Sequence, residues 1–152
     1  AAFPTHVKLS PPPGKPVDTV ILNGAECDPY LTCDHRLMLE WPAEVIEGAE
    51  LLARAVGAKH IWIGTEADKL DAAEALRQAA RATDVRIEVC EVRYPQGAEK
   101  HLILALTGRT VPAGALPLEV GVVVQNIATA LAVRDAVVEF TVTLVLHLPH
   151  CA

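Results

Sequence analysis

Short apolar runs rich in β-branched residues alternate along the chain with longer segments in which apolar residues recur every three or four positions. The clearest helical pattern covers residues 43–56, where the apolar residues share one face and Gly57 follows as a cap. Strands alternating with helices predict an α/β fold, a Rossmann-like and mostly parallel sheet flanked by helices. The same patterns predict strands over 17–22, 59–64, 85–92 and 120–126 and further helices over 68–82, 97–108 and 127–138.

The two ends of the chain differ from the regular core, which covers residues 17–138. Residues 1–16 are rich in proline, which fixes φ and removes backbone donors, so we expect an extended surface arm there. Residues 139–152 alternate apolar and polar side chains, a pattern typical of an edge strand, and no function is assigned to them. Because the first residue is not Met, we expect a piece of a longer protein.

Composition narrows the class of protein. The 152 residues fit one domain, and a content that is 51% hydrophobic but only 4% aromatic suits a parallel sheet covered by helices. The net charge of -6 and the lack of clustered Lys and Arg argue against a nucleic-acid partner. No apolar run approaches the ~20 residues that cross a bilayer, so we expect a soluble chain without direct membrane insertion.

The four cysteines are scattered, which fits reduced thiols in the cytoplasm better than a disulfide framework. A zinc site formed by Cys27, Cys33 and His35 is the weaker alternative, because the C-x5-C-x-H spacing lacks a second ligand pair at the usual distance. We therefore predict no metal site in this chain.

Polar residues gather just after three of the predicted strands. In a parallel sheet, ligands lie outside the carboxyl ends of the strands, so residues in these positions carry the functional weight. The three segments are residues 23–36, 94–100 and 125–129. A ligand site is therefore predicted where these segments leave the sheet.

Asn23 and Asn126 each end an apolar strand and offer a paired donor and acceptor. Such an amide suits the edge of a heterocycle that alternates carbonyl and N–H groups, such as a flavin or a base. The alternative, favoured for either residue taken alone, is that the Asn simply ends its strand. The sequence leaves both interpretations open.

Carboxylates are concentrated in the first of these segments. Glu26 and Asp28 lie two residues apart, and if they share a pocket, their repulsion favours a proton on one of them and creates a proton donor or acceptor. The alternative is that both are solvated loop residues. Asp34 and Arg36 are expected to form an ordinary loop ion pair, worth under ~1 kcal/mol if exposed.

The segment “YPQGAEK”, residues 94–100, joins an aromatic residue, a proline and a glycine to the start of a predicted helix. The free N–H groups of a helix N-terminus attract anions, and Gly97 permits close backbone approach, so a phosphate is a candidate ligand. Plain turn chemistry is the alternative, since no G-x-G-x-x-G or G-x-x-x-x-G-K-[ST] motif occurs.

Four segments together carry a resemblance to a known family: “FPTHVKL”, “NGAECDPYLTCDHRLM”, “YPQGAEKHLILALTGRTVP” and “VGVVVQNIATALAV”. In this order and with similar gaps, they resemble the C subunit of Rnf-type electron transport complexes and, more distantly, the flavin- and NADH-binding subunit of respiratory complex I. The similarity runs from Phe3 to about Val138. It implies a complex I flavoprotein-like α/β domain that binds FMN and accepts hydride from NADH.

The resemblance also implies roles for individual residues. Glu26 and Asp28 are the expected catalytic residues, on an acidic loop beside the isoalloxazine, with Asp28 near the nicotinamide. Lys8 would face the flavin or its phosphate, and Asn126 and Thr129 would hold the FMN phosphate and ribityl chain. The full set of implied cofactor-binding residues is Phe3, Thr5, Lys8, Asn23, Glu26, Tyr94, Gly97, Glu99, Asn126 and Thr129.

Three departures from the family pattern limit these implications. The chain begins Ala1-Ala2 where the family has a glycine-rich flavin loop, and Asp28 stands where the family more often has Glu. No C-x-x-C-x-x-C-x-x-x-C-P run is present, so the 4Fe-4S clusters of a full-length family member cannot be bound here. We therefore expect weak FMN affinity, and whether the chain alone is an enzyme stays open.

The resemblance implies an ion-translocating NADH:ferredoxin oxidoreductase. Its other subunits would be the partners of this chain and would keep it in the cytoplasm, peripheral to the cell membrane. Two alternatives stay open, a related flavoprotein that reduces a cobalamin-type cofactor and a non-catalytic docking domain of an electron-transfer complex.

Overall fold

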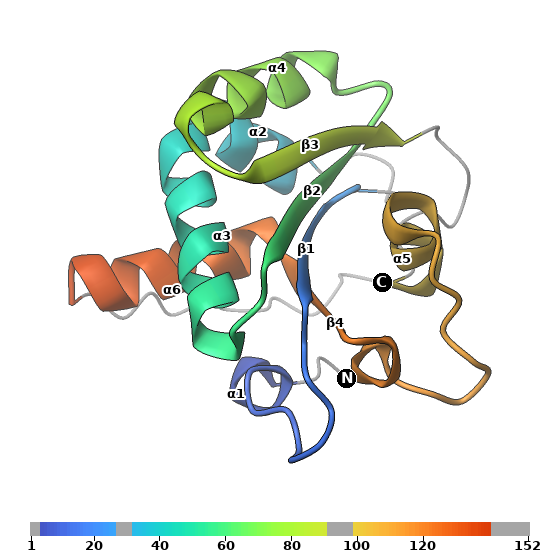
Figure 1. Cartoon of the computed structure of the whole chain (residues 1–152). Coiled ribbons are helices and arrows are strands. Elements are labelled where there is room, and N and C mark those ends of the chain that lie inside the picture. The colour runs from blue at the N-terminus through green and yellow to red at the C-terminus, as the bar shows by residue number, and fades with distance from the viewer. Residues whose placement is uncertain (1–3, 27–31, 91–98, 141–152) are drawn as a thin grey trace, which may run out of the picture.

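The computed structural model of the chain describes residues 4–26, 32–90 and 99–140. In these ranges the strands form one parallel sheet in the order β3-β2-β1-β4 (Figure 1), so the predicted α/β fold is confirmed. The elements in chain order are α1 Thr5–Lys8, β1 Thr19–Gly24, α2 Cys33–Glu40, α3 Pro42–Val56, β2 His60–Glu66, α4 Leu70–Ala79, the 3-10 helix η1 Ala80–Ala82, β3 Val85–Cys90, α5 Glu99–Thr107, the 3-10 helix η2 Pro117–Val120, β4 Val122–Asn126 and α6 Ile127–Val138.

The two faces of the sheet are covered unequally (Figure 1). Helices α2, α3, α4 and α6 pack on one face, where Leu22 and Ile63 belong to the larger apolar core. On the other face, α5 packs through Leu102 and Ile103 against Ile21 of β1. The central strands therefore send alternate apolar residues into two cores, which explains why they appear as continuous apolar runs in the sequence.

Helix α3 has the bounds that its sequence favours. It begins at Pro42, whose fixed φ suits the first turn, and it ends before Gly57, which adopts a left-handed φ of 73°. The backbone N–H of Gly57 donates to the carbonyl of Arg54 and that of Ala58 to Ala53, which satisfies two of the last helical carbonyls. The predicted helix over residues 43–56 is confirmed.

Helices α3 and α6 touch through backbone at one point. A Cβ added at Gly48 in the middle of α3 would lie 2.2 Å from the carbonyl oxygen of Ala130 in α6. Because real Cβ atoms do not approach an oxygen so closely, only glycine permits this distance between the two helices.

A bidentate ion pair closes the amino end of β1. Arg109 donates from Nη1 to Oδ1 of Asp18 at 2.6 Å and from Nη2 to Oδ2 at 2.9 Å, and its Nη1 also donates to the carbonyl of Val120 at 2.9 Å. The guanidinium hydrogen bonds lower the pKa of Asp18, against the opposing effect of burial. This pair ties the connection between α5 and β4 to the first strand.

Two expectations about the first third of the chain are wrong. The proline-rich arm is not wholly extended, because it contains the short helix α1, and Leu9 packs against the larger core. Asp34 and Arg36, which were expected to lie in a loop, belong to α2, which begins at Cys33. The expected tail strand over residues 139–152 lies outside the described residues from position 141 onward.

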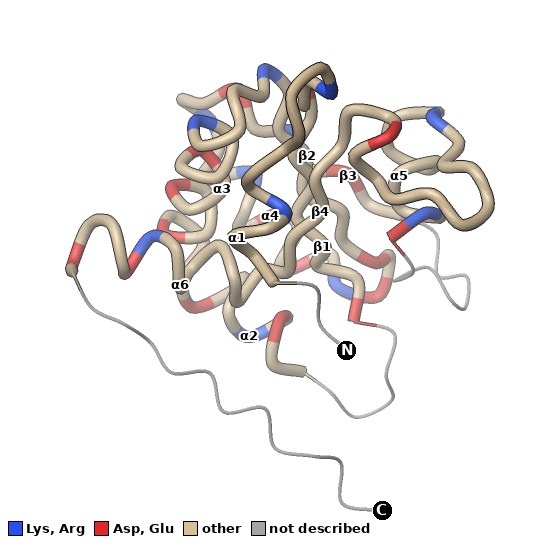
Figure 2. The backbone as a smooth tube through the Cα atoms, turned by 90° about the horizontal axis from the view of Figure 1, so that it is seen from below, with Lys and Arg blue, Asp and Glu red and all other residues tan. Residues whose placement is uncertain are grey.

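The charged residues are spread over the described chain. Figure 2 shows Lys and Arg interspersed with Asp and Glu along the backbone rather than collected on one element. Within the described ranges, no helix is both long and apolar enough to span a membrane.

Replacing Gly48 by Ala tests the contact between α3 and α6. Helix propensity alone favours Ala by about 1 kcal/mol, whereas the steric conflict pushes α6 away from α3. We expect Gly48→Ala to lower the free energy of unfolding by about 1–3 kcal/mol in urea denaturation. Gly57→Ala is the comparison without a steric conflict: its surroundings are open, and only the strain of its φ of 73° should lower the stability, by about 1 kcal/mol. A Gly48→Ala protein as stable as the wild type would contradict this contact.

Candidate functional site

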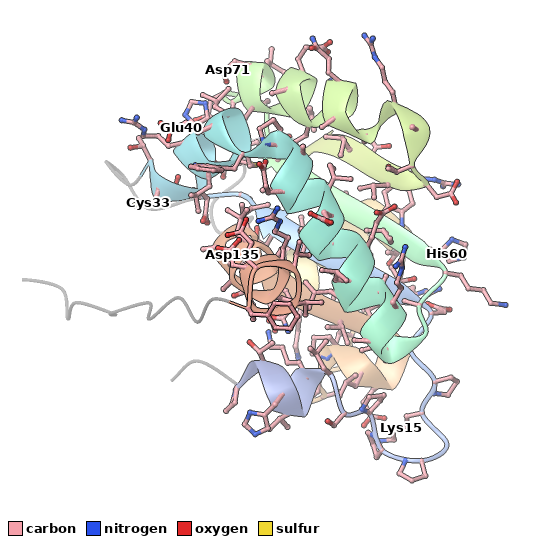
Figure 3. All side chains as sticks on the ribbon, turned by 90° about the vertical axis from the view of Figure 1, so that its left-hand side faces the viewer. Lys15, Cys33, Glu40, His60, Asp71 and Asp135 are labelled. Atoms are coloured by element: carbon pink, nitrogen blue, oxygen red, sulfur yellow. The ribbon has the colours of Figure 1, made fainter. Side chains whose placement is uncertain are left out.

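The carboxyl ends of β1, β2 and β4 meet at one edge of the sheet, called the carboxyl edge below. Asn23 of β1 is paired in register with Gly64 of β2 on one side and with Asn126 of β4 on the other. Figure 3 shows Cys33, where α2 begins, at the end of the sheet opposite His60, the first residue of β2. Helices α2, α4 and α6 follow β1, β2 and β4, so their N-termini lie towards this edge.

Both predicted asparagines are engaged within the chain. Oδ1 of Asn126 accepts the N–H of Ala128 at 2.7 Å and caps α6, while its Nδ2 donates to Oδ2 of Asp34 at 2.6 Å. Oδ1 of Asn23 accepts the N–H of Ala25 at 2.9 Å. Asn126 is the last residue of β4, whereas Asn23 is followed by Gly24, the last residue of β1. Asn126 in addition joins the start of α6 to the start of α2.

Glu26 caps α2 from outside the helix. Its carboxylate accepts the backbone N–H of Asp34 at 3.2 Å and of His35 at 3.5 Å, and only 7% of its side chain is exposed. Thr32, at the N-cap position, makes no such side-chain bond. A negative group at a helix N-terminus is stabilised by the unpaired N–H groups there. Glu26 is thus a fixed, buried carboxylate rather than a solvated loop residue.

Lys69 and Glu66 complete this cluster, and neither was identified from the sequence. Nζ of Lys69 lies 3.1 Å from Oε2 of Glu66 and 3.8 Å from Oε2 of Glu26, and all three side chains are almost fully buried. Their position in the sequence could have indicated them, because Glu66 is the last residue of β2 and a parallel sheet brings the end of that strand to the same edge.

Asp34 lies between Glu26, which accepts its backbone N–H, and Asn126, which donates to its carboxylate. Burial raises its pKa, the negative charge of Glu26 adds to the rise, and the hydrogen bond from Asn126 opposes it. The expected ion pair of Asp34 with Arg36 is wrong, because Arg36 donates from Nε to Glu40 at 2.9 Å, one helical turn further along α2. Asp34 faces the carboxyl edge instead.

The side chain of His35 contacts Asp71 of α4, whereas the predicted alternative of a zinc site would require it to face Cys33 and Cys27. Its Nε2 lies 2.9 Å from Oδ1 of Asp71, which lowers the pKa of Asp71 and joins α2 to α4. Cys33 is exposed and carries a free thiol, and Cys27 lies outside the described residues. Within the described ranges, no group of three His, Cys, Asp or Glu side chains is arranged to hold a metal ion.

Lys8 and Glu99 form a second cluster, and both were predicted to bind cofactor. Nζ of Lys8 lies 2.5 Å from Oε1 of Glu99 at the start of α5 and donates to the carbonyl of Val124 at 2.8 Å. Beside them is a cavity of about 80 Å³ whose other walls are apolar residues of η2 and β4. The arm is therefore attached to the sheet next to the carboxyl end of β4.

Gln125 precedes Asn126 in β4 and is the most unusual polar residue at this edge. It is 5% exposed, and its Nε2 has no hydrogen-bond partner in the part of the chain that the structure describes. A buried amide donor without a partner costs about 1–3 kcal/mol, so a hydrogen-bond acceptor from outside the described residues would stabilise Gln125.

The remaining predicted residues divide into two groups. Thr129 lies in the first turn of α6 and Thr5 is the first residue of α1; both are half-buried. Four predicted residues lie outside the described residues: Phe3, Asp28, Tyr94 and Gly97.

Known proteins match this chain over most of its length. The family described as Nuo51 FMN-binding domain matches residues 1–135. The chain is 52% identical over 140 residues to the C subunit of the Na(+)-translocating ferredoxin:NAD(+) oxidoreductase complex of Acetobacterium woodii. It is 50% identical over 137 residues to the C subunit of the proton-translocating ferredoxin:NAD(+) oxidoreductase complex of Clostridium ljungdahlii. These matches cover 91% and 90% of this chain but 31% and 30% of the relatives, so the chain spans less than a third of their length.

A solved structure shares the fold. The match is to an NAD+-reducing NiFe hydrogenase in the air-oxidized state, with a TM-score of 0.70 and 25% sequence identity. It covers 90% of this chain and 27% of that chain. The expectation of a complex I flavoprotein-like α/β domain is confirmed, and so is the resemblance to the C subunit of Rnf-type complexes.

The pKa of Asp34 makes a prediction about pH. Because the folded state raises this pKa above the ordinary 3.8, the folded chain binds the proton more tightly, and stability falls as pH rises through that interval. Asn cannot ionise, so we expect Asp34→Asn to be more stable than the wild type at pH ~7 and equal to it at or below pH ~4 in urea denaturation.

Asp18→Asn is the matched control with the opposite sign. The pKa of Asp18 is lowered by Arg109, so its contribution is present at neutral pH and is lost on acidification. This variant should be less stable than the wild type at pH ~7 and should approach it below pH ~4. A loss of stability at neutral pH in Asp34→Asn would show that α2 and Asn126 stabilise the charged carboxylate more than burial destabilises it.

Proposed function

The chain belongs to the family of Nuo51 FMN-binding domains, and on that basis we propose that it is the FMN- and NADH-binding core of a C subunit of an Rnf-type, ion-translocating ferredoxin:NAD+ oxidoreductase. The observation that carries the proposal is the match over residues 1–135 together with identities of 50% and 52% to two subunits of that name. The matches cover less than a third of each relative, so the oxidoreductase activity named for these relatives is attributed to this chain only as part of the proposal.

The residues at the carboxyl edge fit a flavin nucleotide. α6 begins beside Asn126 and Thr129, and the positive end of the helix dipole there suits the phosphate and ribityl chain of FMN, although Asn126 already accepts the N–H of Ala128. These positions support FMN as the occupant of this edge.

The acidic wall of the proposed pocket is Glu26, with Asp28 as the expected second carboxylate. FMN, when bound, supplies the redox chemistry by taking electrons from NADH. The chain orients the flavin: Glu26 is held rigidly against α2, and Lys8 and Glu99 lie together at the other side of β4. Phe3, Thr5, Asn23, Tyr94 and Gly97 are proposed to complete the cofactor contacts.

Other subunits of the complex are the proposed partners, since both relatives are named as subunits of one. We propose that they hold this chain at the cytoplasmic face of the membrane. The iron-sulfur clusters that carry electrons onward would lie in other parts of the protein, because the sequence has no run of cysteines that could ligate them.

A fluorescence titration of FMN with the purified chain tests the proposal. The wild-type chain should quench FMN saturably. In the reciprocal variant Asp34→Asn/Asn126→Asp, Asn donates from position 34 and Asp still caps α6, so the hydrogen bond, the cap and the net charge are kept. The negative charge, however, moves to the proposed phosphate position. We expect at least about a tenfold loss of affinity, because like charges a few ångström apart repel by about 1–4 kcal/mol.

Gln78→Glu is the comparison in which a negative charge is placed away from the carboxyl edge, since Gln78 lies on the exposed face of α4 and contacts Glu74. It should bind FMN as the wild type does. No saturable quenching by the wild-type chain would reject flavin binding and favour the docking-domain alternative. Unchanged affinity in the reciprocal variant would place the phosphate away from α6.

A further inference from the structure

Lys69 lies at the carboxyl edge and has no part in the function proposed so far. It occupies the N-cap position of α4, where the helix dipole disfavours a positive charge, and only 9% of its side chain is exposed. A buried ammonium group is costly unless it is paired and hydrogen-bonded. A lysine ammonium in this position therefore needs partners that pair with it and accept its hydrogen bonds.

The partners of Lys69 come from two strand ends. Glu66 is the last residue of β2, and its carboxylate lies 3.1 Å from Nζ of Lys69. The two residues are joined by a tight turn, in which the backbone N–H of Lys69 donates to the carbonyl of Glu66. On the other side, Nζ donates to the backbone carbonyl of Glu26 at 3.3 Å and lies 3.8 Å from its carboxylate. Lys69 therefore holds both the backbone and the side chain of Glu26.

The position of Glu26 is passed on to two helices. Its carboxylate accepts the N–H groups of Asp34 and His35 at the start of α2, and Asp34 in turn accepts from Asn126, which caps α6. A continuous chain of polar contacts thus runs from β2 through Lys69 to the starts of both helices. The first links have little freedom to move, because the side chains of Glu66, Lys69 and Glu26 are buried, whereas Asp34 is half-buried and Asn126 is exposed.

We propose that Lys69 is a positioning residue of the flavin site, whose ammonium holds Glu26 in place and through it fixes the start of α2 beside Asn126. The flavin part of this inference rests on the proposed function, whereas the positioning of Glu26 does not. The alternative is that Lys69 only balances the buried charge of Glu66. Two readouts separate these roles, the exchange rates of the Asp34 and His35 amide hydrogens and the affinity for FMN.

Lys69→Met is the first variant. If Lys69 positions Glu26, the amides of Asp34 and His35 should exchange about tenfold faster, as expected for weakening a hydrogen bond to a charged group. FMN affinity should fall by a similar factor. Lys59→Met is the matched control, an exposed lysine at the opposite end of β2, and it should leave both readouts unchanged.

The double variant Lys69→Met/Glu66→Gln keeps the test decisive if the single variant folds poorly, because it also removes the buried negative charge of Glu66 that the ammonium of Lys69 balances. Its stability should recover relative to Lys69→Met, while exchange at Asp34 and His35 stays fast. Slow exchange in the double variant would overturn the positioning role and leave charge balance. Absence of FMN binding by the wild type would reject the proposed function, and the exchange rates would still decide the role of Lys69.

Discussion

The parallel pairing of β1 with both β2 and β4 is the constraint on which the rest of the molecule depends. Because all three strands run the same way, their carboxyl ends meet, and so do the N-termini of the helices that follow them. Helix N-termini carry partial positive charge, which explains why buried carboxylates such as Glu26 collect at this edge. The chemistry of the site thus begins with strand direction rather than with any single side chain.

Several carboxylates lie at this edge, and few positively charged or hydrogen-bond donor groups stabilise them. Glu26 is held by the start of α2 and by Lys69, whereas Asp34 relies on a neutral donor, the amide of Asn126. Burial raises the pKa of Asp34, and the hydrogen bond from Asn126 and the charge of Lys69 only partly oppose that rise.

Local patterns were sufficient to predict most of the fold. The helix over residues 43–56 has an apolar face and a glycine cap of its own, and the strand ends at Asn23 and Asn126 follow continuous apolar runs. Helix α2 escaped prediction because its cap is Glu26, outside the helix, and because few of its residues are fully buried. Its N-terminal turn is stabilised by a contact that periodicity does not encode.

The sequence indicated which polar residues lie at the carboxyl edge better than it indicated the contacts between them. Glu26 and Asn126 lie there, and their cofactor-binding roles stay a prediction, but the bond from Asn126 to Asp34 spans 92 positions, and nothing in the local sequence indicates it. The sequence predicted an ion pair between Asp34 and the nearest cation, Arg36, but in α2 the Arg36 side chain contacts Glu40 instead. Lys69 was missed because one of its partners, Glu26, lies 43 positions away and becomes its neighbour only when β1 and β2 pair, although Glu66 is three residues away.

The place of β4 in the sheet also sets the order in which the site can be assembled. β4 is the last described strand in the chain, yet it pairs with the first, whereas β1, β2 and β3 with their helices come from the first ninety residues. Pairings so distant in sequence carry a loop-closure cost before any contact is gained. During synthesis, therefore, the acidic wall can form early, but the wall made by β4 and α6 arrives late, and a nascent chain has no complete pocket until nearly all of this domain has left the ribosome.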